Sequence, residues 1–310
     1  MEKDEKRSLM TTNPPKKLFC FGYGYVARHL AKQLKEQDPS WEIFGTTTDK
    51  EKLAQMREDG IKAYLFSDKM PFNDPIFILK DITHILISTP PHKDGDVVFK
   101  AHARDILQIP TVQWIGYLSS TNVYGNRDGE WVDETAEVRP TSERGTKRAK
   151  AETQWLKMRR IAGIPINIFR LSGIYGVGRS AISTVRAGNS KRVHKEGHAF
   201  NRIHVDDITQ ILIASMGHPE PGDIYNLADD NPAQSHELIS YACELLGKTP
   251  LPLIEYDEDL SMAPMARSFY KENKRVSNKK IKEKLGVTLK HPDYKSGLDD
   301  ILEKNKQGIV

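Results

Sequence analysis

Short apolar runs alternate with amphipathic stretches along most of the chain. Several runs, such as residues 83–88 and 112–119, are almost entirely apolar, which is typical of strands buried on both faces of a sheet. The predicted strands are residues 17–21, 41–46, 61–66, 83–88, 112–119, 166–171 and 224–228. The predicted helices are residues 25–37, 50–59, 97–108, 142–162, 204–218, 236–246 and 278–285. Strands that alternate with helices predict an α/β fold with a Rossmann-type, doubly wound parallel sheet.

A glycine-rich turn joins the first predicted strand to the first predicted helix. It reads GYGYVA from Gly22 onward, which is a G-x-G-x-x-A pattern. Gly22 can make the tight turn, Gly24 lets the backbone approach a pyrophosphate, and Ala27 lets the helix pack closely on the strand. The N-terminus of the helix then faces the phosphate charge. The alternative is a chance glycine turn, but the strand-turn-helix context favours a dinucleotide site that also includes Tyr25 and Val26.

The end of the second predicted strand, GTTTDK from Gly45 onward, indicates which cofactor the site takes. A carboxylate there usually binds the ribose 2′-hydroxyl, whereas a basic residue accommodates a 2′-phosphate. The strand end itself carries no acid, and Thr46, Thr48 and Lys50 could hold a phosphate. Asp49 could bind the ribose or cap the next helix, and the cap is favoured. The sequence therefore favours NADP slightly over NAD.

After residue 172 the alternation of apolar runs and amphipathic stretches becomes less regular, because glycine, serine and basic residues interrupt it. Residues 16–172, with a return at 203–230, are predicted to form the dinucleotide-binding domain. Residues 173–202 and 231–310 are predicted to form a smaller C-terminal lobe on the substrate side. The polar residues 1–15 end in Asn-Pro-Pro and predict a disordered tail.

Composition and charge narrow the class of protein. The 310 residues carry a net charge of +4, but Lys and Arg are spread along the chain and form no stripe typical of nucleic-acid binding. No apolar run approaches the length of a transmembrane helix, and the N-terminus lacks the apolar segment of a signal peptide. Cys20 and Cys243 lack metal-ligand spacing and are predicted to be buried thiols in a reducing compartment. We therefore expect a cytoplasmic protein with no metal, membrane or nucleic-acid partner.

Five further motifs follow the glycine-rich turn along the chain. They are LSSTNVYG at 118–125, IFRLSGIYG at 168–176, RIHVDD at 202–207, YNLAD at 225–229 and RVSN at 275–278. Together they resemble an extended short-chain dehydrogenase/reductase, the group that contains the sugar-nucleotide epimerases and dehydratases. The resemblance implies an NAD(P)-binding oxidoreductase or epimerase-like enzyme whose ligand is small and anionic or sugar-nucleotide-like. A homodimer is plausible by the same analogy.

The resemblance also implies an active site that this chain carries only in part. Ser120 occupies the family's Ser or Thr position, which holds the substrate oxygen. The family's Tyr and Lys, however, align with Arg144 and Arg148. An arginine stays protonated and cannot replace a phenol as acid or base, so the chain resembles an atypical branch of the family. Tyr124 and Tyr175, both in Tyr-Gly turns near the expected cleft, are weak substitutes, because such turns are also structural features.

The resemblance indicates the remaining contacts. Ser88, at a predicted strand end, and Arg148 are expected to contact the cofactor, and Arg144, Arg179 and Arg202 are expected to contact an anionic substrate. Two functions stay open. One is an enzyme with a non-standard acid or base, and the other is a non-catalytic NAD(P)-dependent sensor or scaffold protein. The missing Tyr-Lys pair favours the second, whereas the full C-terminal lobe favours the first.

Overall fold

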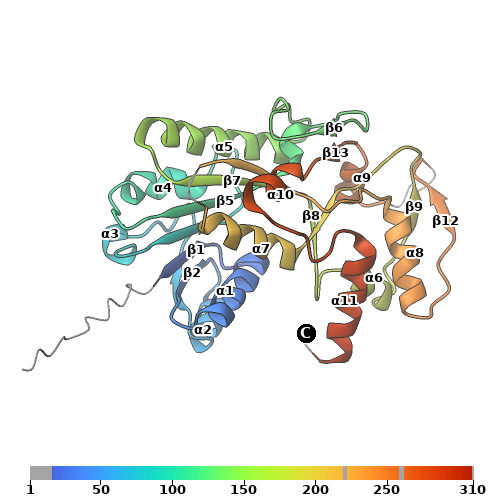
Figure 1. The fold of residues 1–310 in the computed structure, drawn as a ribbon, viewed down its shortest axis with the longest axis horizontal. Coiled ribbons are helices and arrows are strands. Elements are labelled where there is room, and N and C mark those ends of the chain that lie inside the picture. Colours follow the sequence, from blue (N-terminus) through green and yellow to red (C-terminus); the bar gives the residue numbers. More distant parts are fainter. Residues whose placement is uncertain (1–15, 219–221, 258–261, 309–310) are drawn as a thin grey trace, which may run out of the picture.

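The computed structural model describes residues 16–218, 222–257 and 262–308, and its centre is a seven-stranded sheet (Figure 1). In spatial order the strands are β3 (Lys62–Leu65), β2 (Glu42–Thr47), β1 (Lys17–Phe21), β4 (His84–Ile87), β5 (Trp114–Ser120), β7 (Ile166–Leu171) and β11 (Ile224–Leu227). Every neighbouring pair is parallel. The predicted α/β fold of Rossmann type is therefore confirmed, and each of these strands overlaps a predicted apolar run.

The direction in which successive strands are added to the sheet reverses at β1, which makes this position a topological switch point. The chain runs outward from β1 to β2 and β3 on one side, and to β4, β5, β7 and β11 on the other. Cys20 of β1 pairs with Gly45 of β2 and with Leu86 of β4. In open parallel sheets, ligands bind in the crevice outside the carboxyl ends of the strands at such a point.

Helices cover both faces of the sheet. One face carries α1 (Tyr25–Gln37), α2 (Lys50–Glu58), α7 (Val205–Met216) and α10 (Lys279–Leu285), and the other carries α3 (Pro75–Ile78), α4 (Val97–Ile106) and α5 (Glu143–Ala162). Successive residues of a strand point to opposite faces. Accordingly, Leu18 and Cys20 of β1 belong to the first apolar core, and Phe19 and Phe21 belong to the second.

A smaller group of elements lies beyond the carboxyl ends of the strands (Figure 1). Helices α6 (Ala181–Arg186), α8 (Ser235–Leu245) and α11 (Tyr294–Lys306) share a third apolar core. The remaining strands pair two by two and are β8 (Gly173–Tyr175) with β10 (Arg202–His204), β9 (Arg192–His194) with β12 (Leu253–Glu255), and β6 (Trp131–Val132) with β13 (Arg275–Val276). The short helices η1 (Thr121–Tyr124) and α9 (Pro264–Phe269) complete the chain.

Helix α11 is the longest element that the sequence analysis missed. Its apolar positions Tyr294, Leu298 and Ile301 have helical spacing and are buried, and Asp293 caps it. Gly297 and several charged residues obscured this pattern in the sequence. A Cβ atom at Gly297 would lie 2.2 Å from the hydroxyl of Tyr175, so the glycine permits close packing there.

Two other sequence expectations concern single features of the structure. Cys20 and Cys243 are both buried and free, as predicted. Within the described ranges, no helix is both long and apolar enough to cross a membrane. The predicted disordered tail, residues 1–15, lies outside the described residues.

Candidate functional site

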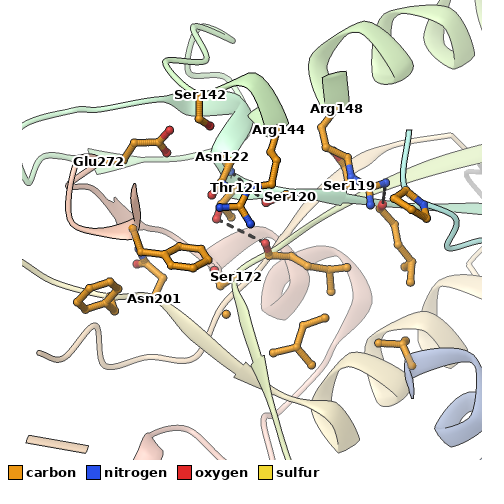
Figure 2. A pocket seen from close by; sticks show the side chains of 18 of the residues that line it. Ser119, Ser120, Thr121, Asn122, Ser142, Arg144, Arg148, Ser172, Asn201 and Glu272 are labelled. Carbon is orange, nitrogen blue, oxygen red and sulfur yellow. Dashed lines mark hydrogen bonds between the residues drawn. The ribbon is translucent and has the colours of Figure 1, made fainter. Parts of the chain in front are cut away.

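A cavity of about 590 Å³ lies at the carboxyl ends of β1, β4, β5 and β7 (Figure 2). Its wall comes from the first turn of α1, the loop after β4, the end of β5, the start of α5, the end of β7 and two segments of the smaller lobe. Its polar and charged residues include Ser88, Ser119, Ser120, Thr121, Asn122, Ser142, Arg144, Lys147, Arg148, Ser172, Arg179, Asn201, Ser268, Glu272 and Lys274. The cavity thus lies at the switch point of the sheet.

The glycine-rich turn forms the wall of the cavity next to β1. Gly22 has a φ angle of +87°, which favours glycine, and a Cβ atom there would lie 2.9 Å from the hydroxyl oxygen of Ser88. Gly24 lines the cavity and precedes α1, and a Cβ atom placed on it would have no heavy atom within 4 Å. The N-terminus of α1 therefore opens onto free space, which is the arrangement that accepts a phosphate group. Tyr25 and Val26 line the same region.

Residues at the end of β2 lie outside the cavity lining. The hydroxyl of Thr46 accepts a hydrogen bond of 2.8 Å from the amide of Gly22, so this buried side chain shapes the turn. Thr48 and Lys50 are exposed. Asp49 accepts hydrogen bonds from the backbone amides at the start of α2, which confirms the predicted cap.

The ends of β4 and β5 bring hydroxyl groups to the cavity. Ser88 donates a hydrogen bond of 2.5 Å to the carbonyl oxygen of Gly22 and thereby holds the turn. Ser120, which is half-buried, accepts a hydrogen bond of 3.2 Å from the amide of Asn122. Ser120 lies at the carboxyl end of β5 in the cavity wall.

Tyr124 lies below the cavity floor, in a buried polar network. Its hydroxyl donates to Asn226 at 2.7 Å and accepts from Arg170 at 2.9 Å. Arg170 in turn forms an ion pair of 2.8 Å with Glu152 of α5. Burial raises the pKa of Tyr124 to about 12. Tyr124 does not line the cavity, and Tyr175 donates its hydroxyl to the backbone of Asp293, so both phenols have structural roles here.

Helix α5 directs three cationic side chains toward the cavity, and Figure 2 shows two of them, Arg144 and Arg148. Arg148 donates to the carbonyl oxygen of Leu118 at 2.7 Å and to the hydroxyl of Tyr117 at 3.0 Å. Arg144, which is exposed, donates to Ser268 of α9 at 3.1 Å. The third cation, Lys147, was not predicted; it forms an ion pair of 2.6 Å with the exposed Glu143.

The other two predicted anion contacts differ in their positions. Arg179 lines the cavity, is exposed, and lies with its guanidinium carbon 6.0 Å from the centre of the Tyr25 ring. Arg202 does not line the cavity. Its buried side chain donates to the carbonyl oxygens of Phe200 and Ala233, at 3.1 and 2.8 Å, because it crosses between two segments of the smaller lobe. Arg202 therefore holds these two segments together.

The smaller lobe adds an acid and a base that the sequence analysis missed. Glu272 accepts a hydrogen bond from Thr141 at 3.1 Å and forms an ion pair of 2.9 Å with Lys274, whose pKa is lowered by burial. Both line the cavity, and Lys274 also donates to the carbonyl oxygen of Gly125. Their segment carries no motif, so only the fold brings them to the site. Ser172, at the end of β7, lines the cavity with a buried hydroxyl that has no hydrogen-bond partner in the protein.

Comparison with solved structures identifies relatives over nearly the whole chain. A conserved protein of unknown function from Silicibacter pomeroyi is 43% identical, with a TM-score of 0.85, and the match covers 93% of this chain and 99% of that one. A dTDP-glucose 4,6-dehydratase from Bacillus anthracis, solved in complex with NAD, is 14% identical with a TM-score of 0.72, and the match covers 94% of this chain and 97% of that one.

A UDP-glucuronic acid 4-epimerase from Bacillus cereus, solved with UDP-glucuronic acid and NAD, has the same fold. It is 16% identical with a TM-score of 0.73, and the match covers 94% of this chain and 99% of that one. No protein-family model matches the chain, and no curated protein matches it.

Proposed function

This chain belongs to the family of the conserved Silicibacter pomeroyi protein and has the fold of the NAD-dependent epimerases and dehydratases, and from this we propose that it binds NAD or NADP. The open space at Gly24 is the observation that carries the proposal, because a pyrophosphate needs such an approach to the backbone. In the same proposal, a small anionic ligand binds in the adjoining part of the cavity.

The residues of the first turn of α1 fit a dinucleotide. The backbone amides of Tyr25 and Val26 would bind the pyrophosphate at the positive end of the helix dipole. Ser88 and Arg148 line the cavity between this turn and the end of β5, where the nicotinamide would lie next to Ser120. When bound, the nicotinamide supplies a site that accepts or donates hydride. NADP remains slightly favoured over NAD, since the carboxylate of Asp49 is used as a helix cap.

Cationic side chains support an anionic ligand. Arg144, Lys147 and Arg179 all line the cavity, and a guanidinium group binds carboxylate or phosphate in a bidentate manner. Glu272 also lines the cavity, next to the start of α5, so the ligand would also offer hydroxyl groups as donors. A sugar nucleotide combines both features, and the Bacillus cereus epimerase was solved with UDP-glucuronic acid.

The reaction would be an oxidation-reduction or epimerisation with a non-standard acid or base. Ser120 would hold the substrate oxygen. The proposal does not assign proton transfer to Tyr124, because this side chain is buried and its hydroxyl makes two hydrogen bonds. A specific observation favours the second function, a non-catalytic sensor or scaffold. Arg148 already binds the end of β5, and Arg144 binds α9, so α5 links the two lobes instead of supplying a proton.

Calorimetric titration with NAD, NADP and UDP-glucuronic acid tests the binding proposal. We expect measurable affinity for a nicotinamide cofactor, and the absence of binding to both cofactors would refute the proposal. Absorbance at the NADH band reports net oxidation of UDP-glucuronic acid, and chromatography of the sugar nucleotide reports epimerisation, which returns the hydride and leaves no net NADH. The two readouts together separate the two functions. Binding without turnover favours the sensor. Turnover that Ser120→Ala abolishes, with cofactor affinity unchanged, favours the enzyme.

The double variant Arg144→Tyr with Arg148→Lys restores the family's residue types. General acid-base catalysis contributes about 10²–10⁴-fold, so an enzyme-like site should gain activity from this change. We also propose a cytoplasmic protein, which the two buried free thiols support, and a homodimer, which light scattering of the purified chain would test.

A further inference from the structure

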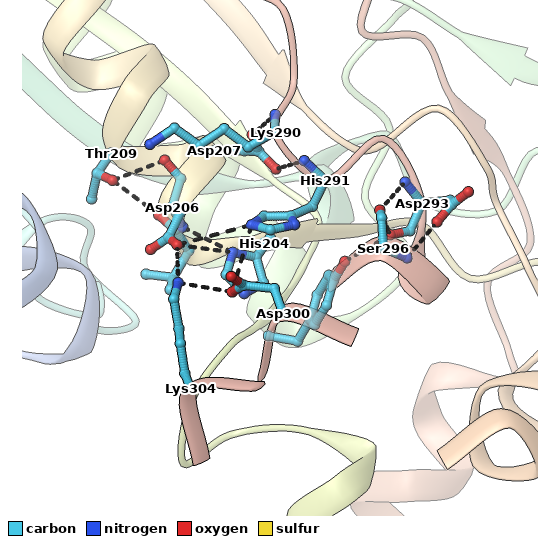
Figure 3. Close-up of polar contacts among 12 residues, drawn as sticks. His204, Asp206, Asp207, Thr209, Lys290, His291, Asp293, Ser296, Asp300 and Lys304 are labelled. Atoms are coloured by element: carbon cyan, nitrogen blue, oxygen red, sulfur yellow. Dashed lines mark hydrogen bonds and ion pairs between the residues drawn. The ribbon is translucent and has the colours of Figure 1, made fainter. Parts of the chain in front are cut away.

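A cluster of two imidazoles and two carboxylates joins helix α7 to helix α11 (Figure 3). His204 ends β10 and Asp206 lies in the first turn of α7, whereas His291 precedes α11 and Asp300 lies within it. One nitrogen or oxygen atom from each of the four lies within 4.8 Å of the others. The side chains of His204 and His291 are only 1% and 9% exposed, so the fold largely shields the cluster from water.

The separations between these atoms are close to those of a tetrahedral metal site. Asp206 Oδ2 lies 3.8 Å from His204 Nδ1 and 3.9 Å from His291 Nε2. Asp300 Oδ2 lies 3.8 Å from His291 Nε2. Ligand atoms about 2.0–2.2 Å from a tetrahedral zinc ion are roughly 3.3–3.6 Å apart. Since all four atoms lie within 4.8 Å of one another, a contraction of up to about 1.5 Å would complete the coordination.

The side chain of Lys304 already places a positive charge in the cluster. Its Nζ lies 2.7 Å from Asp206 Oδ2 and 2.8 Å from Asp300 Oδ2, which are the oxygens that would ligate a metal. Lys304 lies near the end of α11 and its side chain is 28% exposed, so its ammonium group can move into solvent. A divalent ion would neutralise both carboxylates, whereas Lys304 neutralises one.

The two imidazoles favour a transition metal over magnesium or calcium. The backbone amide of Asp206 donates to His204 Nδ1 at 3.2 Å, so this nitrogen carries a lone pair. His204 Nε2 and His291 Nδ1 are buried without a hydrogen-bond partner. A metal on His204 Nδ1 would replace the amide hydrogen bond as well as the ammonium group, so we expect moderate affinity.

We propose that His204, Asp206, His291 and Asp300 form a site for a divalent transition-metal ion of the zinc class, with the Lys304 ammonium as the competing occupant. The bound ion would tie α7, which packs on the sheet, to α11 of the smaller lobe. None of the four residues lines the cavity, so this proposal does not depend on the proposed function. The sequence analysis expected no metal. The two pairs of ligands lie far apart in the chain, so no local spacing indicates the cluster.

Cobalt and zinc titrations test the proposal. The full chain without an affinity tag, first freed of metal with a chelator, is titrated with Co²⁺, whose visible absorption reports tetrahedral coordination. Zinc affinity is then measured by competition with a chromophoric chelator. We expect one ion per chain. Lys304→Met should bind it at least about tenfold more tightly, because the competing charge is gone, and Asp300→Asn should bind it about 10–100-fold more weakly. Lys306→Met, at an exposed neighbour, is the matched control and should behave as the wild type.

Circular dichroism shows which variants fold, and Lys304→Gln replaces Lys304→Met if the latter does not. The proposal is overturned if the folded Lys304 variant binds zinc no more tightly than the wild type. It is also overturned if Asp300→Asn leaves the cobalt spectrum unchanged, because the metal would then lie elsewhere. A wild type and a folded Lys304 variant that both bind no ion would leave the cluster as a network of ion pairs only.

Discussion

Two walls of the cavity offer a ligand different kinds of groups. The glycine-turn wall, residues 22–27, presents backbone at the N-terminus of α1 and has free space at Gly24. The α5 wall, formed by Arg144, Lys147 and Arg148, presents long cationic side chains. Arg144 and Arg148 already bind other parts of the protein. The first wall keeps the G-x-G-x-x-A pattern, whereas the second carries arginines where the resemblance predicts a Tyr and a Lys.

The difference shows which part of the site depends on backbone and which on side-chain chemistry. A turn that receives a pyrophosphate needs small residues, and any substitution there is costly for binding. A proton-transfer pair needs two particular side chains, and its replacement by arginines leaves the helix intact. Binding and catalysis can therefore diverge separately in this fold.

Gly24→Val is expected to have the largest effect on cofactor affinity, and it acts on the glycine-turn wall. The Cβ position at Gly24 is open and its φ angle is −92°, so a valine fits the folded chain. The branched side chain would occupy the space of the pyrophosphate. We expect cofactor affinity to fall by about 100-fold, or about 2.7 kcal/mol, in calorimetric titration.

Gly217→Val is the matched control for Gly24→Val. Gly217 follows α7 with a φ angle of −88°, and the nearest heavy atom to a Cβ there is 3.8 Å away. Its substitution should leave both affinity and melting temperature close to those of the wild type. Unchanged cofactor affinity in a folded Gly24→Val protein would remove the glycine-turn wall from the binding site.

Gly22→Val should instead destabilise the fold. Gly22 has a φ angle of +87°, and a Cβ atom would lie 2.9 Å from Ser88 Oγ and 3.2 Å from the backbone nitrogen of Thr89. Strain of this kind costs about 1–3 kcal/mol, and the contact with backbone adds to it. Urea denaturation should show a lower free energy of unfolding. Equal stability of Gly22→Val and Gly24→Val would contradict the distinct roles of the two glycines.

Arg148→Met tests the α5 wall. Arg148 binds the carbonyl oxygen of Leu118 and the hydroxyl of Tyr117, so its loss leaves two polar groups without a partner. We expect the free energy of unfolding to fall by about 1–3 kcal/mol in urea denaturation. Lys147→Met is the control, because its ion pair with the exposed Glu143 should contribute less than about 1 kcal/mol. A larger loss for Lys147→Met would mean that Arg148 does not tie α5 to the sheet.

The same contrast explains how much could be predicted from the sequence. The central strands and the glycine turn depend on local patterns, namely continuous apolar runs and small residues at fixed spacing. They lie where the sequence places them, and so does the Asp49 cap. Helix α11 was missed, because Gly297 interrupts its helical spacing, and that glycine is explained only by its packing against Tyr175.

Features that depend on contacts between distant segments could not be predicted. Glu272 and Lys274 reach the cavity because their segment packs against Thr141 and Gly125. The sequence motif around Arg202 gives no sign that its side chain crosses to two backbone carbonyls. In each case the residue type indicates a charge, and only the fold determines what the charge contacts.

A buried histidine of the smaller lobe, His198, should make the stability of the protein depend on pH. His198 is buried, and its Nε2 donates to the carbonyl oxygen of Glu272. Burial lowers the pKa of His198 to about 4, below the usual value near 6.5. As the pH falls below about 6.5, His198 binds a proton in the unfolded chain but stays neutral in the folded chain. The free energy of unfolding should therefore fall between pH 6.5 and 4.

Urea denaturation of the wild type and of His198→Gln measures this contribution. The variant should lose less stability on acidification, and at pH 6 the difference should be under about 1 kcal/mol. His92→Gln, at a side chain that is 54% exposed, is the control and should follow the wild type. Parallel pH profiles for His198→Gln and the wild type would show that His198 is protonated alike in both states.

Lys50→Ala is expected to have the smallest effect, and it extends the glycine-turn wall toward the ribose of the cofactor. Lys50 is exposed at the start of α2, outside the cavity lining. A contact between its ammonium group and a 2′-phosphate would be screened by water and would contribute about 0.5–1 kcal/mol, or roughly a factor of 2–5 in affinity. Only NADP carries this phosphate, so calorimetric titration should show weaker binding of NADP and unchanged binding of NAD. Lys52→Ala, two positions further along α2, is the control and should alter neither affinity. Equal losses of affinity for both cofactors in Lys50→Ala would reject the preference for NADP, and so would tighter binding of NAD by the wild type. In either case the glycine-turn wall would recognise only the pyrophosphate of the cofactor.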